Sequence, residues 1–427
     1  TIDAVVPGGA AAKDGRLKKG DKIIAVDSGD GTGMQDVIDM DLDKVVQLIR
    51  GKEGTKVKLL IMRKATNGEV KRISIELTRA VVQIKDSEAK SDVMPVNSKK
   101  IGIINLPSFY IDYRDCQENP LTCRSSANDM AREIKKLKAQ NVDGIILDLR
   151  RNGGGDLSEV QKMVGFFIGD PIVTQIEDRD NQVRSLDSDA KALYTGPLAV
   201  LVSKYTASAS EILAGAVQDY GRGLILGDSR TFGKGTVQTV IEIPGTSGRQ
   251  TNGAIHVTIA KFFRPSGKSN QEKGILSDVV IPDIIDATDT GEDEYDYALP
   301  YTVIKPSREF TPEQDISSII PELQQISADR VERTAEFKEI IAAVKKAKSD
   351  KNTFVSLMEE NLKKSSKKKT EKKNKNEANS IEDNLPDFSI KVINKKDVEL
   401  KEASNILLDS VRLLDGKKDW TQNEARE

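Results

Sequence analysis

Histidine is almost absent from this chain, since His256 is the only one among 427 residues. A Ser-His-Asp triad would have to use this residue. The alternation over residues 254–259 instead predicts a strand with His256 and Thr258 on its polar face. Cysteine is nearly as scarce, with two residues, so no Cys/His set of four zinc ligands can be assembled. We expect neither a metal site nor a cofactor.

Net charge and long apolar runs are also lacking. Lys and Arg number 65 against 67 Asp and Glu, so a basic surface for nucleic acid is not expected. No apolar run approaches the roughly 18 residues that cross a bilayer. Thr1 opens directly on a strand-like stretch, so we expect any export signal to lie outside this chain.

Two short segments carry the chemistry that is present. Residues 206–211 read Thr-Ala-Ser-Ala-Ser-Glu, and residues 232–238 read Phe-Gly-Lys-Gly-Thr-Val-Gln. A serine hydroxyl needs a neighbouring proton acceptor, and a lysine can supply it when its amine is neutral, which a desolvated cleft favours. Alone, the first segment could be a helix cap and the second a solvated turn. Together they predict a serine hydrolase whose base is Lys234.

A third segment offers backbone N–H groups. Residues 148–155, Asp-Leu-Arg-Arg-Asn-Gly-Gly-Gly, follow a strand that reads as buried. Ser208 precedes a helix expected from about residue 210 to 219, whose N-terminus favours developing negative charge. We expect an oxyanion site formed by the N–H of Ala209 and one N–H from the Gly153-Gly154 turn. The alternative for these glycines is a flexible surface loop.

These segments resemble the tail-specific, or C-terminal processing, proteases, which are Ser-Lys endopeptidases with an inserted PDZ domain. The resemblance continues through residues 221–227 and 273–279. It implies an α/β catalytic core of the crotonase-like/ClpP-like type with a largely parallel sheet. A serine endopeptidase would then act on C-terminal or unfolded segments of polypeptides through an acyl-enzyme.

The resemblance also implies roles for single residues. Ser208 matches the nucleophile, although Ser210 is a rival that fits a helix cap better. Gln238 matches a glutamine that orients the lysine, and residues 234, 236 and 238 would share one strand face. Asp219 matches a further family position, but at the end of its helix it could equally be a structural hydrogen-bond acceptor.

Four regions are expected along the chain. Residues 1–65 resemble a PDZ domain without its first strand and carboxylate-binding loop, and 66–100 read as a linker with connecting strands, polar from 85 to 100. Residues 101–300 form the protease core and 301–427 a helical region. One helical face of the PDZ region is expected to form a groove wall for peptides: Leu42, Val45, Val46 and Ile49.

Three further features concern the loops and the C-terminal region. An apolar stripe over residues 400–414 predicts a helix that packs on another element. Residues 363–375 hold eight lysines and one acid, which favours a solvated linker over a site for an anionic partner. Cys116 and Cys123 share one polar loop, where they would form a disulfide in an oxidising compartment or stay free thiols in the cytosol; we favour the disulfide.

Two other functions stay open. One is a non-catalytic PDZ scaffold, and the other is a crotonase-type acyl-CoA enzyme, which would need a placed pair of carboxylates. The expected partners are polypeptides with accessible C-termini and an adaptor protein. The resemblance implies the bacterial periplasm.

Overall fold

The computed structural model describes residues 1–2, 5, 9–64, 69–80, 88–120, 122–244, 251–312, 316–350 and 397–415. It separates into two compact units, Thr1–Glu88 and Ala89–Glu427. Residues 66–100 are therefore not one connecting region. Strand β4 (Val70–Thr78) belongs to the sheet of the first unit, and strand β5 (Lys90–Val96) belongs to the sheet of the second.

The first unit is a four-stranded antiparallel sheet with two short helices. The order is β2 (Met34–Asp36), β1 (Lys22–Asp27), β3 (Lys56–Lys64) and β4, with α1 (Ala10–Asp14) and α2 (Leu42–Ile49). The expected alternation in β3 is present, because Val57, Leu59 and Ile61 are all buried.

Helix α2 turns only part of its expected apolar face to this core. Val45 and Ile49 pack there together with Leu48. Val46 is half-buried, whereas Leu42 is 74% exposed. The predicted groove wall therefore includes one large apolar side chain that is open to solvent.

The second unit is built on a six-stranded sheet that is parallel except at one edge. The order is β14 (Val279–Val280), β11 (Leu224–Gly227), β10 (Leu198–Val202), β7 (Gly144–Asp148), β6 (Lys99–Asn105) and β5. Only β5 runs antiparallel to its neighbour. The expected largely parallel α/β core is confirmed. The expectation of a polar linker over 85–100 is wrong for Lys90–Val96, because an edge strand needs only one apolar face.

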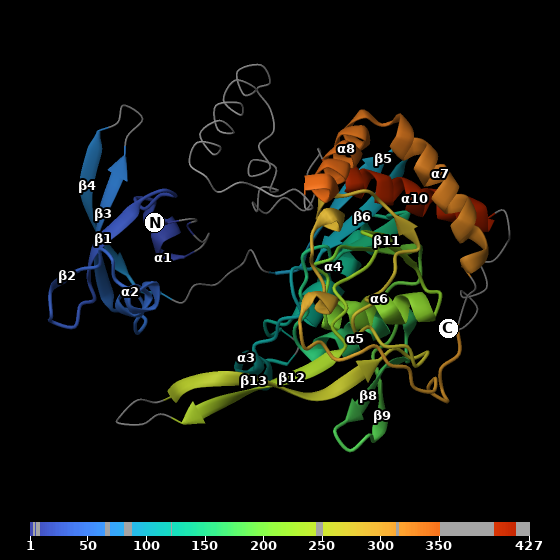
Figure 1. Ribbon diagram of the computed structural model, residues 1–427, viewed down its shortest axis with the longest axis horizontal. Coiled ribbons are helices and arrows are strands. Elements are labelled where there is room, and N and C mark those ends of the chain that lie inside the picture. Colours follow the sequence, from blue (N-terminus) through green and yellow to red (C-terminus); the bar gives the residue numbers. More distant parts are fainter. Residues whose placement is uncertain are drawn as a thin grey trace. The chain divides into compact units, whose positions relative to one another are not determined.

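Helices cover both faces of this sheet (Figure 1). Alternate strand residues such as Ile145 and Leu147 pack with α4 (Ser126–Ala139), α5 (Leu157–Ile168) and α6 (Ala209–Asp219). Their neighbours, such as Ile146 and Leu201, pack with α7 (Ile320–Arg333), α8 (Ala335–Asp350) and α10 (Val398–Asp415). Both faces of the buried strands are thus apolar, which explains their continuous hydrophobic runs.

The C-terminal helices are therefore a layer of the core and not an appendage. The predicted stripe on α10 is buried at Leu400, Ala403, Leu407 and Leu414, and Val411 is half-buried. The lysine-rich residues 363–375 lie outside the described residues. In the described part of the chain, no helix combines the length and apolar character that crossing a bilayer requires.

A second, antiparallel sheet has the order β12 (Thr236–Pro244), β13 (Thr251–Phe263), β8 (Ile172–Asp178) and β9 (Val183–Asp187). Strands β12 and β13 form a long ribbon that extends away from the helices of this unit (Figure 1). Most side chains near its far end are exposed, including Val240, Ile241 and Ile255. Strand β12 begins two residues after Lys234, so the ribbon connects directly to the candidate site.

Candidate active site

Ser208 lies in a sharp turn between strand β10 and helix α6. The helix begins at Ala209, one residue earlier than expected, and Ser208 has φ 58° and ψ −117°. A positive φ is uncommon for a residue with a side chain. The turn is held by the Ser208 N–H, which donates to Glu211 Oε2 at 2.8 Å. The half-buried serine therefore stands at the positive end of the helix, as predicted.

Ser210 has a different environment. It lies inside α6 and is fully buried, and its hydroxyl donates to the backbone oxygen of Asn152 at 2.9 Å. This residue is therefore not the helix cap that the sequence suggested. Its engaged hydroxyl also argues against the rival assignment as nucleophile.

Lys234 lies in the loop between β11 and β12. Its Nζ donates to Gln238 Oε1 at 3.2 Å, which is the contact expected for a glutamine that orients the lysine. The preceding Gly233 has φ 96°, and a Cβ there would lie 2.8 Å from the backbone carbon of Glu272. The loop passes so close to the backbone of residue 272 that only glycine fits this position.

Glu211 brings the serine and lysine segments together. Its Oε2 accepts the N–H of Ser208 at 2.8 Å and the N–H of Lys234 at 2.9 Å. Its Oε1 accepts from Thr231 Oγ1 at 2.5 Å and from the N–H of Gly233 at 2.8 Å. Because one oxygen atom receives both N–H groups, the backbones of Ser208 and Lys234 are neighbours.

The carboxyl group of Glu211 is fully buried. Burial raises its pKa from 4.5 to about 7, against the opposing effect of the four donors. The sequence alone predicts no role for Glu211. The Ser-x-x-Glu spacing of a capping box was the signal that could have drawn attention to it.

The two reactive side chains are not hydrogen-bonded to each other in this structure. Within the described residues, no hydrogen bond joins Ser208 Oγ to Lys234 Nζ. The lysine amine is instead engaged by Gln238. Catalytic hydrogen bonds are often long or unformed before substrate binds, so this geometry is compatible with a Ser-Lys pair.

The glycine turn, residues 152–155, contacts the serine directly. A Cβ on Gly154, whose φ is 106°, would lie 2.8 Å from Ser208 Cβ and 3.1 Å from the nitrogen of Ala209. Asn152 is fully buried and organises the turn: its backbone oxygen accepts the N–H of Ala207 at 3.1 Å, and its Oδ1 accepts the N–H of Gly154 at 2.9 Å. The turn is thus a built part of the site and not a surface loop.

This arrangement distinguishes the expected oxyanion donors. The N–H of Gly154 is already engaged by Asn152. The N–H groups of Gly153 and Ala209 have no acceptor among the described residues. Of the two glycines, the geometry therefore favours Gly153 as the donor that accompanies Ala209.

Asp219 and His256 lie apart from this cluster. Asp219 ends helix α6, about 16 Å along the helix from Ser208 at 1.5 Å per residue. Its carboxylate pairs with Arg264 and accepts the N–H of Ser266 at 3.0 Å, which favours the structural alternative. His256 is exposed on β13, opposite Val240.

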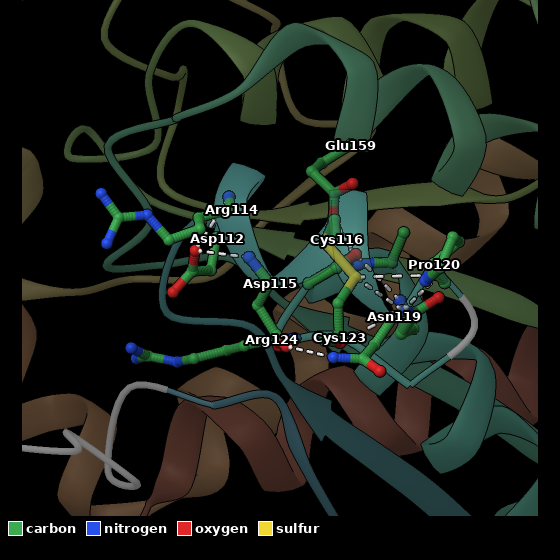
Figure 2. Close-up of a disulfide and its surroundings, with 12 residues drawn as sticks. Asp112, Arg114, Asp115, Cys116, Asn119, Pro120, Cys123, Arg124 and Glu159 are labelled. Atoms are coloured by element: carbon green, nitrogen blue, oxygen red, sulfur yellow. Dashed lines mark hydrogen bonds between the residues drawn. A yellow bond between two sulfur atoms is a disulfide. The ribbon is translucent and has the colours of Figure 1, made fainter.

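A disulfide stabilises the segment next to the glycine turn. Cys116, in α3 (Tyr113–Glu118), is bonded to Cys123 (Figure 2). Asp115 Oδ2 accepts the N–H of Arg124 at 2.7 Å across the same loop. The hydroxyl of Tyr113 donates to Asp156, which follows the glycine turn and caps α5. The disulfide loop is therefore tied to the far end of that turn.

Comparison with known proteins gives three family matches. The model of peptidase family S41 matches residues 100–281, that of the C-terminal domain of tail-specific protease matches 285–412, and the PDZ domain model matches 1–62. The matches therefore cover both units.

Individual relatives agree with these matches. The tail-specific protease of Haemophilus influenzae is 38% identical over 346 residues, which are 80% of this chain and 47% of that protein. The carboxyl-terminal-processing protease of a Picosynechococcus species is 29% identical, over 66% of this chain and 61% of that protein. The solved structure of a photosystem II D1 C-terminal processing protease is 27% identical, with a TM-score of 0.39, over 66% of this chain and 67% of that one. The chain spans less than two thirds of the length of either curated relative.

Proposed function

We propose that this chain, which matches the models of peptidase family S41 and of the C-terminal domain of tail-specific protease, is a serine endopeptidase with Ser208 as nucleophile and Lys234 as general base. The observation that carries this proposal is the shared acceptor Glu211 Oε2, which holds the backbones of Ser208 and Lys234 side by side. Neither alternative function explains why a buried carboxylate should join these two segments.

The reaction follows from the placement of these groups. Lys234 Nζ, as general base, accepts the hydroxyl proton as Ser208 Oγ attacks the scissile carbonyl carbon. The N–H groups of Ala209 and Gly153 stabilise the resulting oxyanion. Lys234 then donates its proton to the leaving amine, which gives an acyl-enzyme. A water molecule, deprotonated by the same lysine, hydrolyses the ester and restores Ser208, while Gln238 orients the amine.

The PDZ unit supplies the recognition step of this proposal. PDZ domains bind peptide C-termini as an added strand, with pockets for alternate side chains. The face with Leu42, Val45, Val46 and Ile49 is the proposed groove wall, and the exposed Leu42 supports this role. Substrates are then polypeptides with accessible C-termini or unfolded segments, delivered directly or by an adaptor protein in the bacterial periplasm.

The proposal is tested by incubating the purified protein with an unstructured polypeptide. Wild type and Ser210→Ala should cleave it, the latter within about tenfold, because Ser210 contributes one hydrogen bond to the turn. Ser208→Ala should lose several orders of magnitude in kcat/KM. Binding without cleavage by every variant would support the PDZ scaffold. Hydrolysis of an acyl-CoA but not of the polypeptide would support the crotonase-type enzyme.

A further inference from the structure

Arg150, two residues before Asn152, joins the strand that leads into the glycine turn to the C-terminal helix α10. Its Nη2 lies 2.7 Å from Asp148 Oδ2 and 2.7 Å from Asp397 Oδ2. Its Nη1 lies 2.6 Å from Glu399 Oε2 and 3.2 Å from Asp397 Oδ1. The planar guanidinium thus binds one carboxylate of its own strand and two from a segment almost 250 residues later in the chain.

The carboxylate of Asp397 has two roles in this contact. Besides binding Arg150, its Oδ1 accepts the N–H of Leu400 at 2.9 Å and so caps α10. The helix itself is fixed by apolar side chains against the core sheet, with Leu400, Ala403 and Leu407 at most 1% exposed. Arg150 is therefore bound to an element that cannot move independently of the sheet.

The backbone at Arg150 is hydrogen-bonded to the segment that leads to Ser208. Its carbonyl oxygen accepts from the hydroxyl of Ser203, which follows β10. The adjacent carbonyl of Leu149 accepts from Thr206 Oγ1 at 2.8 Å, two residues before Ser208. Side chain and backbone together fix the point from which the glycine turn starts.

We propose that the beginning of α10 positions the glycine turn for catalysis by binding Arg150, so that the helical C-terminal region is a component of the catalytic unit. Arg150, Asp397 and Glu399 are positioning residues, because they act through the turn and touch no substrate. The inference rests on the proposed function, in which Gly153 donates to the oxyanion.

The test removes the charge of Asp397 without removing its cap. Asparagine is as good an N-cap as aspartate, so Asp397→Asn should keep α10 in place. It should weaken the hydrogen bonds and the charge attraction between residue 397 and Arg150. The matched control is Glu402→Gln on the same helix. Glu402 pairs with Arg330 at 2.8 Å, which ties α10 to α7 and makes no contact with the glycine turn.

Steady-state cleavage of an unstructured peptide gives the first readout. Loss of one oxyanion donor costs about 100-fold to 1,000-fold in kcat, so a displaced donor should cost about 10-fold to 100-fold. We expect Asp397→Asn to lower kcat by that factor, with KM changed less than about threefold. Glu402→Gln should leave kcat within about twofold of the wild-type value. Its thermal midpoint should fall by about as much as that of Asp397→Asn.

Inhibition by a peptide boronic acid gives the second readout, because its tetrahedral adduct with Ser208 places an oxygen at the oxyanion position. Its affinity should fall in Asp397→Asn by about the same factor as kcat. If Asp397→Asn destabilises the fold much more than Glu402→Gln does, Glu399→Ala replaces it, since it removes one contact to Arg150 and leaves those of Asp397.

The inference is overturned if the α10 variants that contact Arg150 match Glu402→Gln in kcat and in boronic-acid affinity. Failure of the proposed function would look different: wild type would then cleave no polypeptide, or Ser208→Ala would cleave it as fast as wild type.

Discussion

The surroundings of Ser208 and Lys234 differ although one carboxylate holds both backbones. On the serine side, Ala209, Ser210 and Asn152 are at most 2% exposed, and the backbone oxygen of Asn152 accepts both the Ser210 hydroxyl and the N–H of Ala207. On the lysine side, Lys234 is half-buried and Gln238 is exposed at the base of a ribbon whose far end lies in solvent. The proposed nucleophile is fixed by the core, whereas the amine of the proposed base is oriented by one exposed side chain.

This difference implies that the two residues of the proposed dyad are positioned to different degrees. The backbone positions of both residues are set in advance through Glu211. The final contact between the hydroxyl and the amine is absent, and the amine donates to Gln238 instead. Substitutions on the serine side should therefore act through the backbone, and those on the lysine side through the amine.

The largest effect is expected from the amine itself. Lys234→Ala and Lys234→Arg should each lower kcat/KM by about 10,000-fold or more, the latter because a guanidinium does not lose its proton at accessible pH. The fold should persist, since the contact with Glu211 is made by the backbone N–H of residue 234. Steady-state kinetics and thermal melting measure the two quantities, and an active arginine variant would end the general-base assignment.

The next effect concerns the glycine turn. Gly154→Ala places a Cβ 2.8 Å from Ser208 Cβ at φ 106°, so the nucleophile must shift. We expect kcat/KM to fall about 100-fold, as for a misplaced catalytic group. Gly153→Ala keeps the backbone N–H that we propose as an oxyanion donor and its Cβ would meet nothing within 4 Å, so its loss of kcat/KM should be the smaller of the two. Equal losses in the two variants would show that the close approach of Gly154 is not important.

Glu211→Gln should reduce kcat/KM by a smaller factor, about tenfold, because an amide offers one acceptor oxygen where the carboxylate serves four donors. It should also change the pH dependence of stability. Since the folded pKa is raised from 4.5 to about 7, the wild type loses stability as the pH rises through this window. The glutamine variant lacks this contribution.

Thermal midpoints across that pH window measure the difference. Burial also raises the pKa of Asp228 to about 7. Part of the slope of thermal midpoint against pH should therefore remain in both proteins. Identical slopes for wild type and Glu211→Gln would mean that Glu211 does not titrate in this range.

The smallest effects are expected on the ribbon. Gln238 and His256 lie on one face of it, because Gln238 pairs with Thr258 and Val240 pairs with His256. Gln238→Ala should slow kcat about fivefold by releasing the lysine amine, on the scale of one hydrogen bond. His256→Ala should stay within about twofold. A larger loss from His256→Ala at unchanged thermal midpoint would revive a histidine-dependent mechanism.

The sequence predicted those parts of the site whose chemistry is local. The Ser-Ala-Ser-Glu and Gly-Lys-Gly segments each contain a reactive side chain with its structural neighbours, and continuous apolar runs such as residues 144–149 indicated buried parallel strands. Helix α10 was also predictable, because its apolar stripe required a partner. These features depend on spacing within a few residues.

The remaining features depend on contacts between distant segments. Nothing near Glu211 in the sequence indicates that it accepts an N–H from residue 234, and nothing near Arg150 indicates that its partners are residues 397 and 399. Ser210 looked like a cap because its actual acceptor, Asn152, is far away in the chain. Strand β5 was missed because an edge strand with one covered face can be polar in sequence.

The packing of α10 against the core sheet has a consequence for biosynthesis. A ribosome completes Ser208 and Lys234 long before it reaches residues 397–415, and the sheet face that α10 covers, with Ile146 and Leu201, stays exposed during that interval. The nascent chain therefore carries the serine and lysine segments while the helix that binds Arg150 is still missing. A product that ended before residue 397 would present these apolar strands to chaperones, and under the proposed function it would cleave peptides poorly, so that translation itself would delay the onset of cleavage.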